Sequence, residues 1–142
     1  MYQQHSGSPV PKLRHPPVTD DYPLLLITPH ARFRINSHGH ELGLKEDDRL
    51  QMHPQDARIR GIHEGEVVKV FNDIGWFSAE VHLNESIAPG VVSKLQGTWV
   101  ELDGAKGSLG SGGSVNMVSP TEPTMPSNGS RTHTVGVQVV LP

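Results

Sequence analysis

Histidine is the residue type through which this chain could most readily do chemistry, because nine histidines occur among its 142 residues. The densest group is His38-Gly39-His40, and imidazole is a common metal ligand. A zinc site, however, needs three or four ligands that converge with a defined geometry. Neither an HExxH sequence nor a pair of histidines spaced along a helix occurs. We therefore predict no metal site in this chain.

Cysteine is absent. Its absence excludes disulfide bonds, thiolate metal sites, iron–sulfur ligation and cysteine nucleophiles together. Asp56 and Arg58 have the positions of helix-end and surface residues, so they are not candidate catalysts. We predict no catalytic residue.

The segment Pro29–Asp48, PHARFRINSHGHELGLKEDD, has no sustained hydrophobic period. It is long for a loop, and long loops in compact domains are often functional. It carries Arg32 and Arg34, which the local sequence alone favours as surface charges.

Composition excludes two classes of partner. The net charge is −3, no block of five Lys or Arg occurs, and aromatic residues make up only 5%, so a nucleic-acid partner is not expected. No apolar run approaches the roughly 18 residues of a membrane span, and MYQQHSGSPVPK lacks the apolar core of a signal peptide. We expect a soluble chain without membrane insertion, in the cytoplasm or the periplasm.

The chain length predicts one domain. Met1–Asp21 is polar and rich in proline, and we interpret it as a flexible arm or linker that precedes a domain over residues 22–142. In that domain short apolar or alternating runs predict strands. They cover Tyr22–Thr28, Arg49–His53, Glu66–Asn72, Trp76–Leu83, Gly90–Gly97 and Thr132–Leu141, the last with Val135, Val137 and Val139 on one face.

Turns and one helix connect these strands. Pro54 suits the first turn of a short helix and Gly61 its left-handed end, with Ala57, Ile59 and Ile62 expected to face inward. Asn72–Gly75 reads as a tight hairpin turn. Asp103–Gly113 and Pro120–Arg131 are expected to be loops. Closing about six such strands into a barrel would remove exposed sheet edges.

From Tyr22 to Val140 the chain resembles one known family. The resemblance rests on LQMHPQDARIRGIHEGEVVKVFNDIG, on YPLLLITPHARFRINSH before it, and on APGVVSKLQGTW, GGSVNMVSP and HTVGVQV after it. These segments resemble the C-terminal dinucleotide-binding domain of molybdopterin oxidoreductases of the dimethyl sulfoxide reductase type. This resemblance implies a mainly β fold, a six-stranded double-psi β-barrel with one or two short helices and long loops.

The resemblance also implies cofactor-binding residues in four loops. Asn36 occupies the position of a second family histidine, and Ser130 replaces a family asparagine. For the two arginines it favours ligand contact by one, not both. The implied residues are Thr28, His30, Arg32, Arg34, Asn36 and Ser37 in the first loop, Gln96 and Gly97 in the second, Asn116 in the third, and Gly129 and His133 in the fourth.

The implied cofactor is molybdopterin guanine dinucleotide with molybdenum or tungsten, the metal being liganded by other domains. The expected partners are the remaining domains or a large subunit of the parent oxidoreductase, and the isolated chain is not expected to turn over. One alternative is a double-psi barrel that binds a protein partner, favoured if the His30–Ser37 and Gly112–Asn116 loops lie far apart. A weaker alternative is an enzyme that cleaves itself at a Gly-Ser pair.

Overall fold

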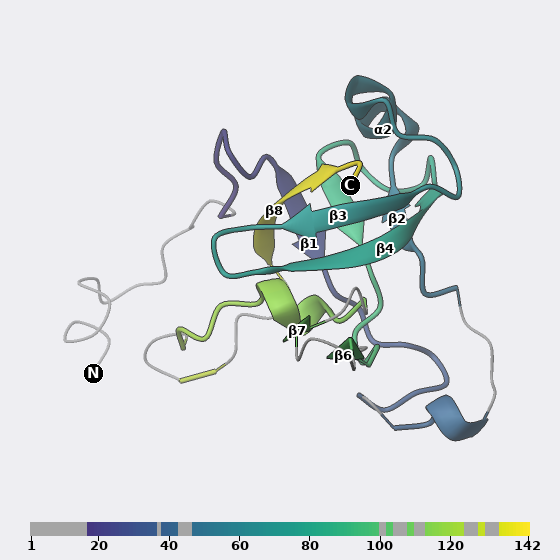
Figure 1. Ribbon diagram of the computed structural model, residues 1–142, viewed down its shortest axis with the longest axis vertical. Coiled ribbons are helices and arrows are strands. Elements are labelled where there is room, and N and C mark those ends of the chain that lie inside the picture. The colour runs from purple at the N-terminus through teal and green to yellow at the C-terminus, as the bar shows by residue number, and fades with distance from the viewer. Residues whose placement is uncertain are drawn as a thin grey trace.

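The computed structural model describes residues 17–36, 38–42, 47–99, 102–103, 108–109, 113–123, 128–129 and 134–142. Six strands close into a barrel in the order β1-β5-β2-β4-β3-β8 (Figure 1). The strands are β1 (Leu24–Ile27), β2 (Leu50–Met52), β3 (Val67–Phe71), β4 (Trp76–Leu83), β5 (Val91–Ser93) and β8 (Val135–Val140). This confirms the predicted mainly β, six-stranded double-psi barrel.

Two of the strand pairs are parallel and the rest are antiparallel. β1 runs parallel to β5, and β2 runs parallel to β4. β2 is antiparallel to β5, so the carboxyl ends of β1 and β5 lie at one end of the barrel and that of β2 at the other. We call the first the site end. The inward side chains are almost wholly aliphatic, with Phe77 as the one aromatic ring in the core cluster of the described residues.

The predicted helix forms as α2 (Pro54–Arg60), with an N-terminus that its own sequence stabilises. His53 caps it, because its Nδ1 accepts a hydrogen bond from the Gln55 amide at 3.1 Å. Gly61 ends it with φ of 65°, a left-handed conformation that glycine adopts without strain. Asp56 accepts a hydrogen bond from the Gly90 amide at 2.7 Å and so ties α2 to the turn before β5.

Ile59 does not face inward as predicted. Ala57 and Ile62 are buried, whereas Ile59 is 73% exposed. Residues two apart on a helix point about 200° away from each other, so Ala57 and Ile59 cannot share the core face.

Two further predictions needed correction. The strand expected over Gly90–Gly97 ends at Ser93, because β5 pairs with its neighbours only over Val91–Ser93 and Gly97 turns with φ of 91°. Asp103–Gly113 is not all loop, since β6 (Leu102–Asp103) and β7 (Ser108–Leu109) pair as a small antiparallel sheet.

Two short 3-10 helices, η1 (His40–Leu42) and η2 (Val115–Val118), complete the described elements. No helix in the described ranges is long and apolar enough to cross a membrane.

Candidate functional site

The loops that follow β1 and β5 begin side by side at the site end. The two strands are parallel and in register, with Ile27 opposite Ser93. Their pairing continues past the strands: the Lys94 amide donates to the Ile27 carbonyl at 3.1 Å and the Gln96 amide to the Pro29 carbonyl at 3.0 Å. Two loops that are distant in sequence are thus held together by backbone hydrogen bonds.

This pairing brings together the side chains of His30 and Gln96, which we call the rim pair. The Gln96 amide nitrogen lies 2.5 Å from His30 Nδ1. The amide can donate to an unprotonated Nδ1, or its oxygen can accept from a protonated ring when the amide is turned over. His30 is exposed and Gln96 half-buried, so the rim pair offers donors and acceptors to a ligand at this end.

Behind the rim pair lies a charged cluster of Arg34, Asp48, Lys94 and Thr98, which we call the Lys94 cluster. The Lys94 ammonium donates to the Asp48 carboxylate at 2.8 Å, to the Asp48 carbonyl at 2.7 Å and to the Thr98 hydroxyl at 3.4 Å. The Thr98 hydroxyl in turn donates to the other Asp48 oxygen at 2.6 Å. Arg34 pairs with Asp48 at 3.6 Å.

The electrostatics of the Lys94 cluster are set by burial. The side chains of Arg34 and Lys94 are only 5% and 3% exposed, while that of Asp48 is 28% exposed. Burial lowers the pKa of the Lys94 ammonium below its ordinary 10.5, the hydrogen bond to Asp48 opposes this shift, and the charge of Arg34 adds to it. Two cationic side chains therefore meet at one partly exposed carboxylate.

The third predicted loop reaches the same place through Gly113. A methyl group added at Gly113 would lie 3.0 Å from Lys94 Cε and 3.2 Å from the Ser78 carbonyl oxygen. The backbone therefore approaches Lys94 so closely that any side chain here would crowd both groups. Three residues later Asn116 stands exposed on η2, which the Asn72 side chain anchors through the Val118 carbonyl at 2.8 Å.

The predicted site residues divide by burial. His30, Arg32, Asn36, Asn116 and Gly129 are exposed, and Gln96 and Gly97 are half-buried. Thr28 and Arg34 are buried beneath the surface. Ser37 and His133 lie outside the described residues.

The two arginines of the first loop have different environments. Arg34 is buried in the Lys94 cluster, whereas Arg32 is exposed with its guanidinium 5.2 Å from the Phe33 ring centre. Asn36 occupies the tip of a tight turn closed by reciprocal Ile35 and His38 hydrogen bonds, with φ of 52°. Asparagine tolerates this left-handed conformation better than most residues do.

Sequence reasoning missed Asp48, Lys94 and Thr98. The signal for Lys94 was present: strand residues two apart share a face, and Val92 is fully buried, so Lys94 follows on the inner side. A lysine that continues the buried face of a strand needs an acidic partner. No sequence signal identified that partner as Asp48, 46 residues earlier.

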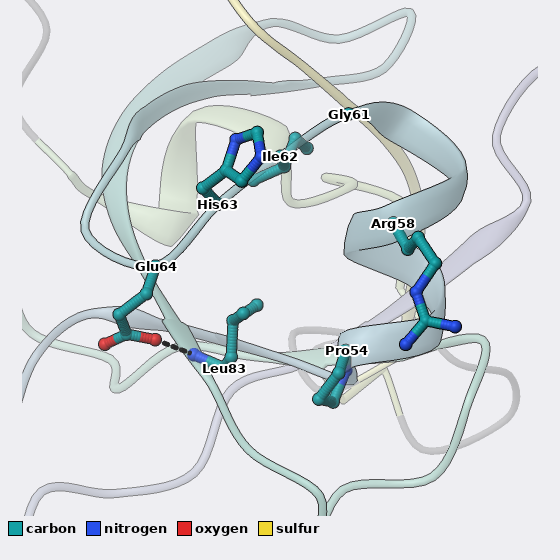
Figure 2. Close-up of a pocket in the computed structure, with 7 residues that line it drawn as sticks. All are labelled: Pro54, Arg58, Gly61, Ile62, His63, Glu64 and Leu83. Atoms are coloured by element: carbon teal, nitrogen blue, oxygen red, sulfur yellow. Dashed lines mark hydrogen bonds between the residues drawn. The ribbon is translucent and has the colours of Figure 1, made fainter.

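A cleft of about 370 Å³ lies at the opposite end, beside α2. Figure 2 shows Pro54 and Arg58 on its helical side and His63 and Glu64 across from them. Glu64 already accepts a hydrogen bond from the Leu83 amide at 2.6 Å, and the His63 side chain is 81% exposed. The cleft holds none of the predicted residues, so we place the candidate site at the site end.

Comparison with known proteins identifies a family and a fold. A family model described as "Molydopterin dinucleotide binding domain" matches residues 24–135. Dimethyl sulfoxide reductase DmsA of Escherichia coli is 38% identical over 90 residues, covering 61% of this chain and 11% of that protein. Trimethylamine-N-oxide reductase of Haemophilus influenzae is 34% identical over 90 residues, covering 59% and 11%.

Among solved structures, acetylene hydratase from Pelobacter acetylenicus superposes with a TM-score of 0.75 at 19% identity, covering 94% of this chain and 21% of that one. At that identity the likeness supports the fold alone. The chain spans about a tenth of the length of the curated relatives that it matches.

Proposed function

This chain belongs to the molybdopterin dinucleotide-binding domain family, and we propose that it is the cofactor-holding part of a larger molybdenum or tungsten oxidoreductase. The family match confirms the resemblance and the cofactor-binding role predicted from the sequence. The proposal goes further in making this chain part of a larger parent enzyme, because the matched relatives are about ten times longer than their matching region. By itself the chain is expected to show no turnover.

The observation that carries the proposal is the convergence of three predicted loops at the site end. The rim pair presents hydrogen-bonding groups, Gly97 and Gly113 allow close backbone approach, and the cations Arg34 and Lys94 lie behind them. A dinucleotide presents a pyrophosphate and a flat ring with a polar edge, and these features fit that set of groups. When bound, the cofactor supplies the redox chemistry, and the protein supplies position and electrostatics.

We assign direct cofactor contact to the accessible predicted residues, and a role behind them to Arg34. Arg32 is the arginine that can reach a ligand, because Arg34 is buried against Asp48. The assigned contacts are His30, Arg32, Asn36, Gln96, Gly97, Asn116 and Gly129. We further propose that the cofactor is the guanine dinucleotide form of molybdopterin. Its metal is proposed to be liganded by residues outside this chain.

The proposed partner is the remainder of the parent enzyme, docked at the site end. Large apolar side chains on the first two loops are exposed to solvent, and exposed apolar groups of this kind mark contact surfaces. They are Phe33 (46% exposed), Ile35 (77%), Leu42 (65%) and Trp99 (63%). Residues that close over a cofactor would bury these groups as well.

The protein-binding alternative loses its support. It was favoured if the His30–Ser37 and Gly112–Asn116 loops lie far apart, whereas Arg34 of the first loop belongs to the Lys94 cluster and Gly113 of the third lies next to Lys94. The self-cleavage alternative predicts two fragments, so an intact-mass measurement of the purified chain tests it directly.

The first test of the proposed function is an NMR titration of the isotope-labelled chain with GDP, a guanine nucleotide that carries the pyrophosphate. We expect amide shifts near His30, Gln96 and Asn116. His30→Ala should weaken binding about three- to tenfold, the effect of one hydrogen-bonding group.

His63→Ala is the matched control, because His63 lies in the α2 cleft at the other end of the barrel. It should bind GDP as the parent chain does. Shifts centred on the α2 cleft, or equal losses in the two variants, would overturn the assignment.

A further inference from the structure

We propose that Lys94 is a positioning residue that holds the three cofactor-facing loops in their relative places. The inference rests on the proposed function for its consequence, but its structural content can be tested without any ligand. Lys94 is not among the residues to which we assign direct contact with the cofactor. It acts through the loops that meet around it.

The first loop is closed on itself by the Lys94 cluster. Arg34 lies in its first half and Asp48 at its end, two residues before Leu50 begins β2, and the two side chains are joined at 3.6 Å. The Asp48 carboxylate also accepts from Lys94 at 2.8 Å and from Thr98 at 2.6 Å. One carboxylate therefore connects both halves of the first loop to the second loop.

The second loop is fixed by its own residues on either side of the rim. Lys94 precedes Gln96 by two residues and Thr98 follows it by two. Both are anchored on Asp48, so Gln96 and Gly97 form a short arch between two fixed points. This arch places the Gln96 side chain against His30.

The third loop is positioned by contact with the Lys94 side chain. A methyl group added at Gly113 would lie only 3.0 Å from Lys94 Cε, so the backbone of this loop lies close against the Lys94 side chain. The chain then enters η2, where Asn116 stands exposed. A shift of the Lys94 side chain would change the path by which this loop reaches Asn116.

Each hydrogen-bonding direction of the Lys94 ammonium is used within the protein. Its donors go to the Asp48 carboxylate, the Asp48 carbonyl and the Thr98 hydroxyl. An ammonium that is buried and fully engaged is not available to a ligand. This separates Lys94 from the exposed rim pair and assigns it the role of support.

The decisive test is amide hydrogen exchange of the chain without ligand, comparing Lys94→Met with Lys69→Met. The control removes a lysine from the outer side of β3, where it lies over the Phe71 and Trp76 rings. We expect Lys94→Met to speed exchange at least tenfold at the Gln96 amide and to change the amide chemical shifts of Arg34 and Gly113. The amides of β3 and β4 should stay protected. Lys69→Met should leave these loop amides unchanged.

Thr98→Val provides a second variant that strands no buried charge. It removes one hydrogen bond to Asp48 and should loosen the same amides to a smaller degree. If Lys94→Met does not fold, Thr98→Val decides the question. Unchanged exchange in all three loops, or loosening spread evenly over the barrel, would overturn the positioning role.

GDP titration of the same variants separates this inference from the proposed function. If the function is right, Lys94→Met should weaken GDP binding about tenfold or more, as supporting residues behind a ligand shell do. If the loops loosen but the parent chain binds no GDP, positioning by Lys94 stands and the proposed function fails. If GDP binds equally to the parent chain and to Lys94→Met, the positioning role fails.

Discussion

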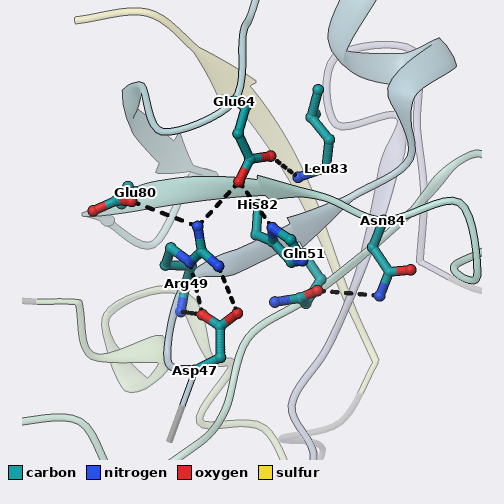
Figure 3. Close-up of polar contacts among 8 residues, drawn as sticks. All are labelled: Asp47, Arg49, Gln51, Glu64, Glu80, His82, Leu83 and Asn84. Atoms are coloured by element: carbon teal, nitrogen blue, oxygen red, sulfur yellow. Dashed lines mark hydrogen bonds and ion pairs between the residues drawn. The ribbon is translucent and has the colours of Figure 1, made fainter.

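Two aspartates that are adjacent in sequence belong to two different charged regions of this barrel. Asp48 turns inward to the Lys94 cluster, where both cationic side chains are almost fully buried. Asp47 turns outward to Arg49, which also contacts Glu64 at 3.0 Å and Glu80 at 3.8 Å (Figure 3). We call this second region, completed by His82, the outer network. Its side chains are between 34% and 51% exposed.

The two regions use the same chemistry with different consequences. Water screens the outer network, and exposed ion pairs contribute little to stability. Water hardly reaches the Arg34 and Lys94 side chains of the Lys94 cluster, so these charges depend more strongly on their protein partners. Burial, rather than the number of ion pairs, decides which region holds the loops in place.

The largest expected effect is that of Asp48→Asn. It removes the carboxylate that Lys94 and Arg34 share, and we expect the free energy of unfolding to fall by about 3 kcal/mol near neutral pH. The burial cost of a charged lysine with a lowered pKa is present below that pKa and is relieved as pH rises toward 10.5. The deficit relative to the parent chain should therefore shrink at high pH, as denaturant unfolding at several pH values would show. A deficit that does not change with pH would show that Lys94 is not its source.

A middle-sized effect is expected for Gly113→Ala. The added methyl group meets the flexible Lys94 side chain and the fixed Ser78 carbonyl, so we expect a loss of about 1–2 kcal/mol from overpacking. Gly90→Ala is a poor control because φ there is 82°; Ser93→Ala in β5 is a better one. Thermal unfolding measures both variants, and a neutral Gly113→Ala would mean that Lys94 moves aside freely.

The smallest effect is expected for Asp47→Asn. Hydrogen bonds from Arg49 lower the pKa of Asp47 from 3.8 to about 2, but exposure limits the contribution to about 1 kcal/mol or less. For a carboxylate with a lowered pKa, this stability is present above 3.8 and is lost as pH falls toward 2. The difference between Asp47→Asn and the parent chain should vanish by about pH 2 and should also weaken with added salt. A loss as large as that of Asp48→Asn would break the comparison.

Much of the fold could be predicted because its signals are local. Alternation over Trp76–Leu83 predicted β4 with its observed bounds, and Pro54 and Gly61 marked both ends of α2. Val135, Val137 and Val139 share the buried face as expected. The errors fell where local pattern and tertiary context disagree, as at Ile59 and in the stretch after Ser93.

The candidate site was predicted in part. The family resemblance identified His30 and Gln96, which the structure places in contact. It favoured ligand contact by one of Arg32 and Arg34 without choosing between them, and the structure distinguishes the two, since Arg34 is buried against Asp48 and Arg32 is exposed. Asp48, Lys94 and Thr98 escaped notice because an ion pair between residues 46 apart leaves no periodic signal in the sequence.

By itself, the sequence determined most of the strands, the helix with its caps and, through the order of its motifs, the resemblance to the family. These follow from periodicity, turn chemistry and motif order, which act over a few residues at a time. Only the tertiary structure decided which loops meet, which arginine is buried and which of two adjacent aspartates faces inward. Those outcomes depend on the parallel pairing of β1 with β5, and strand pairing between distant segments is a property of the closed barrel as a whole.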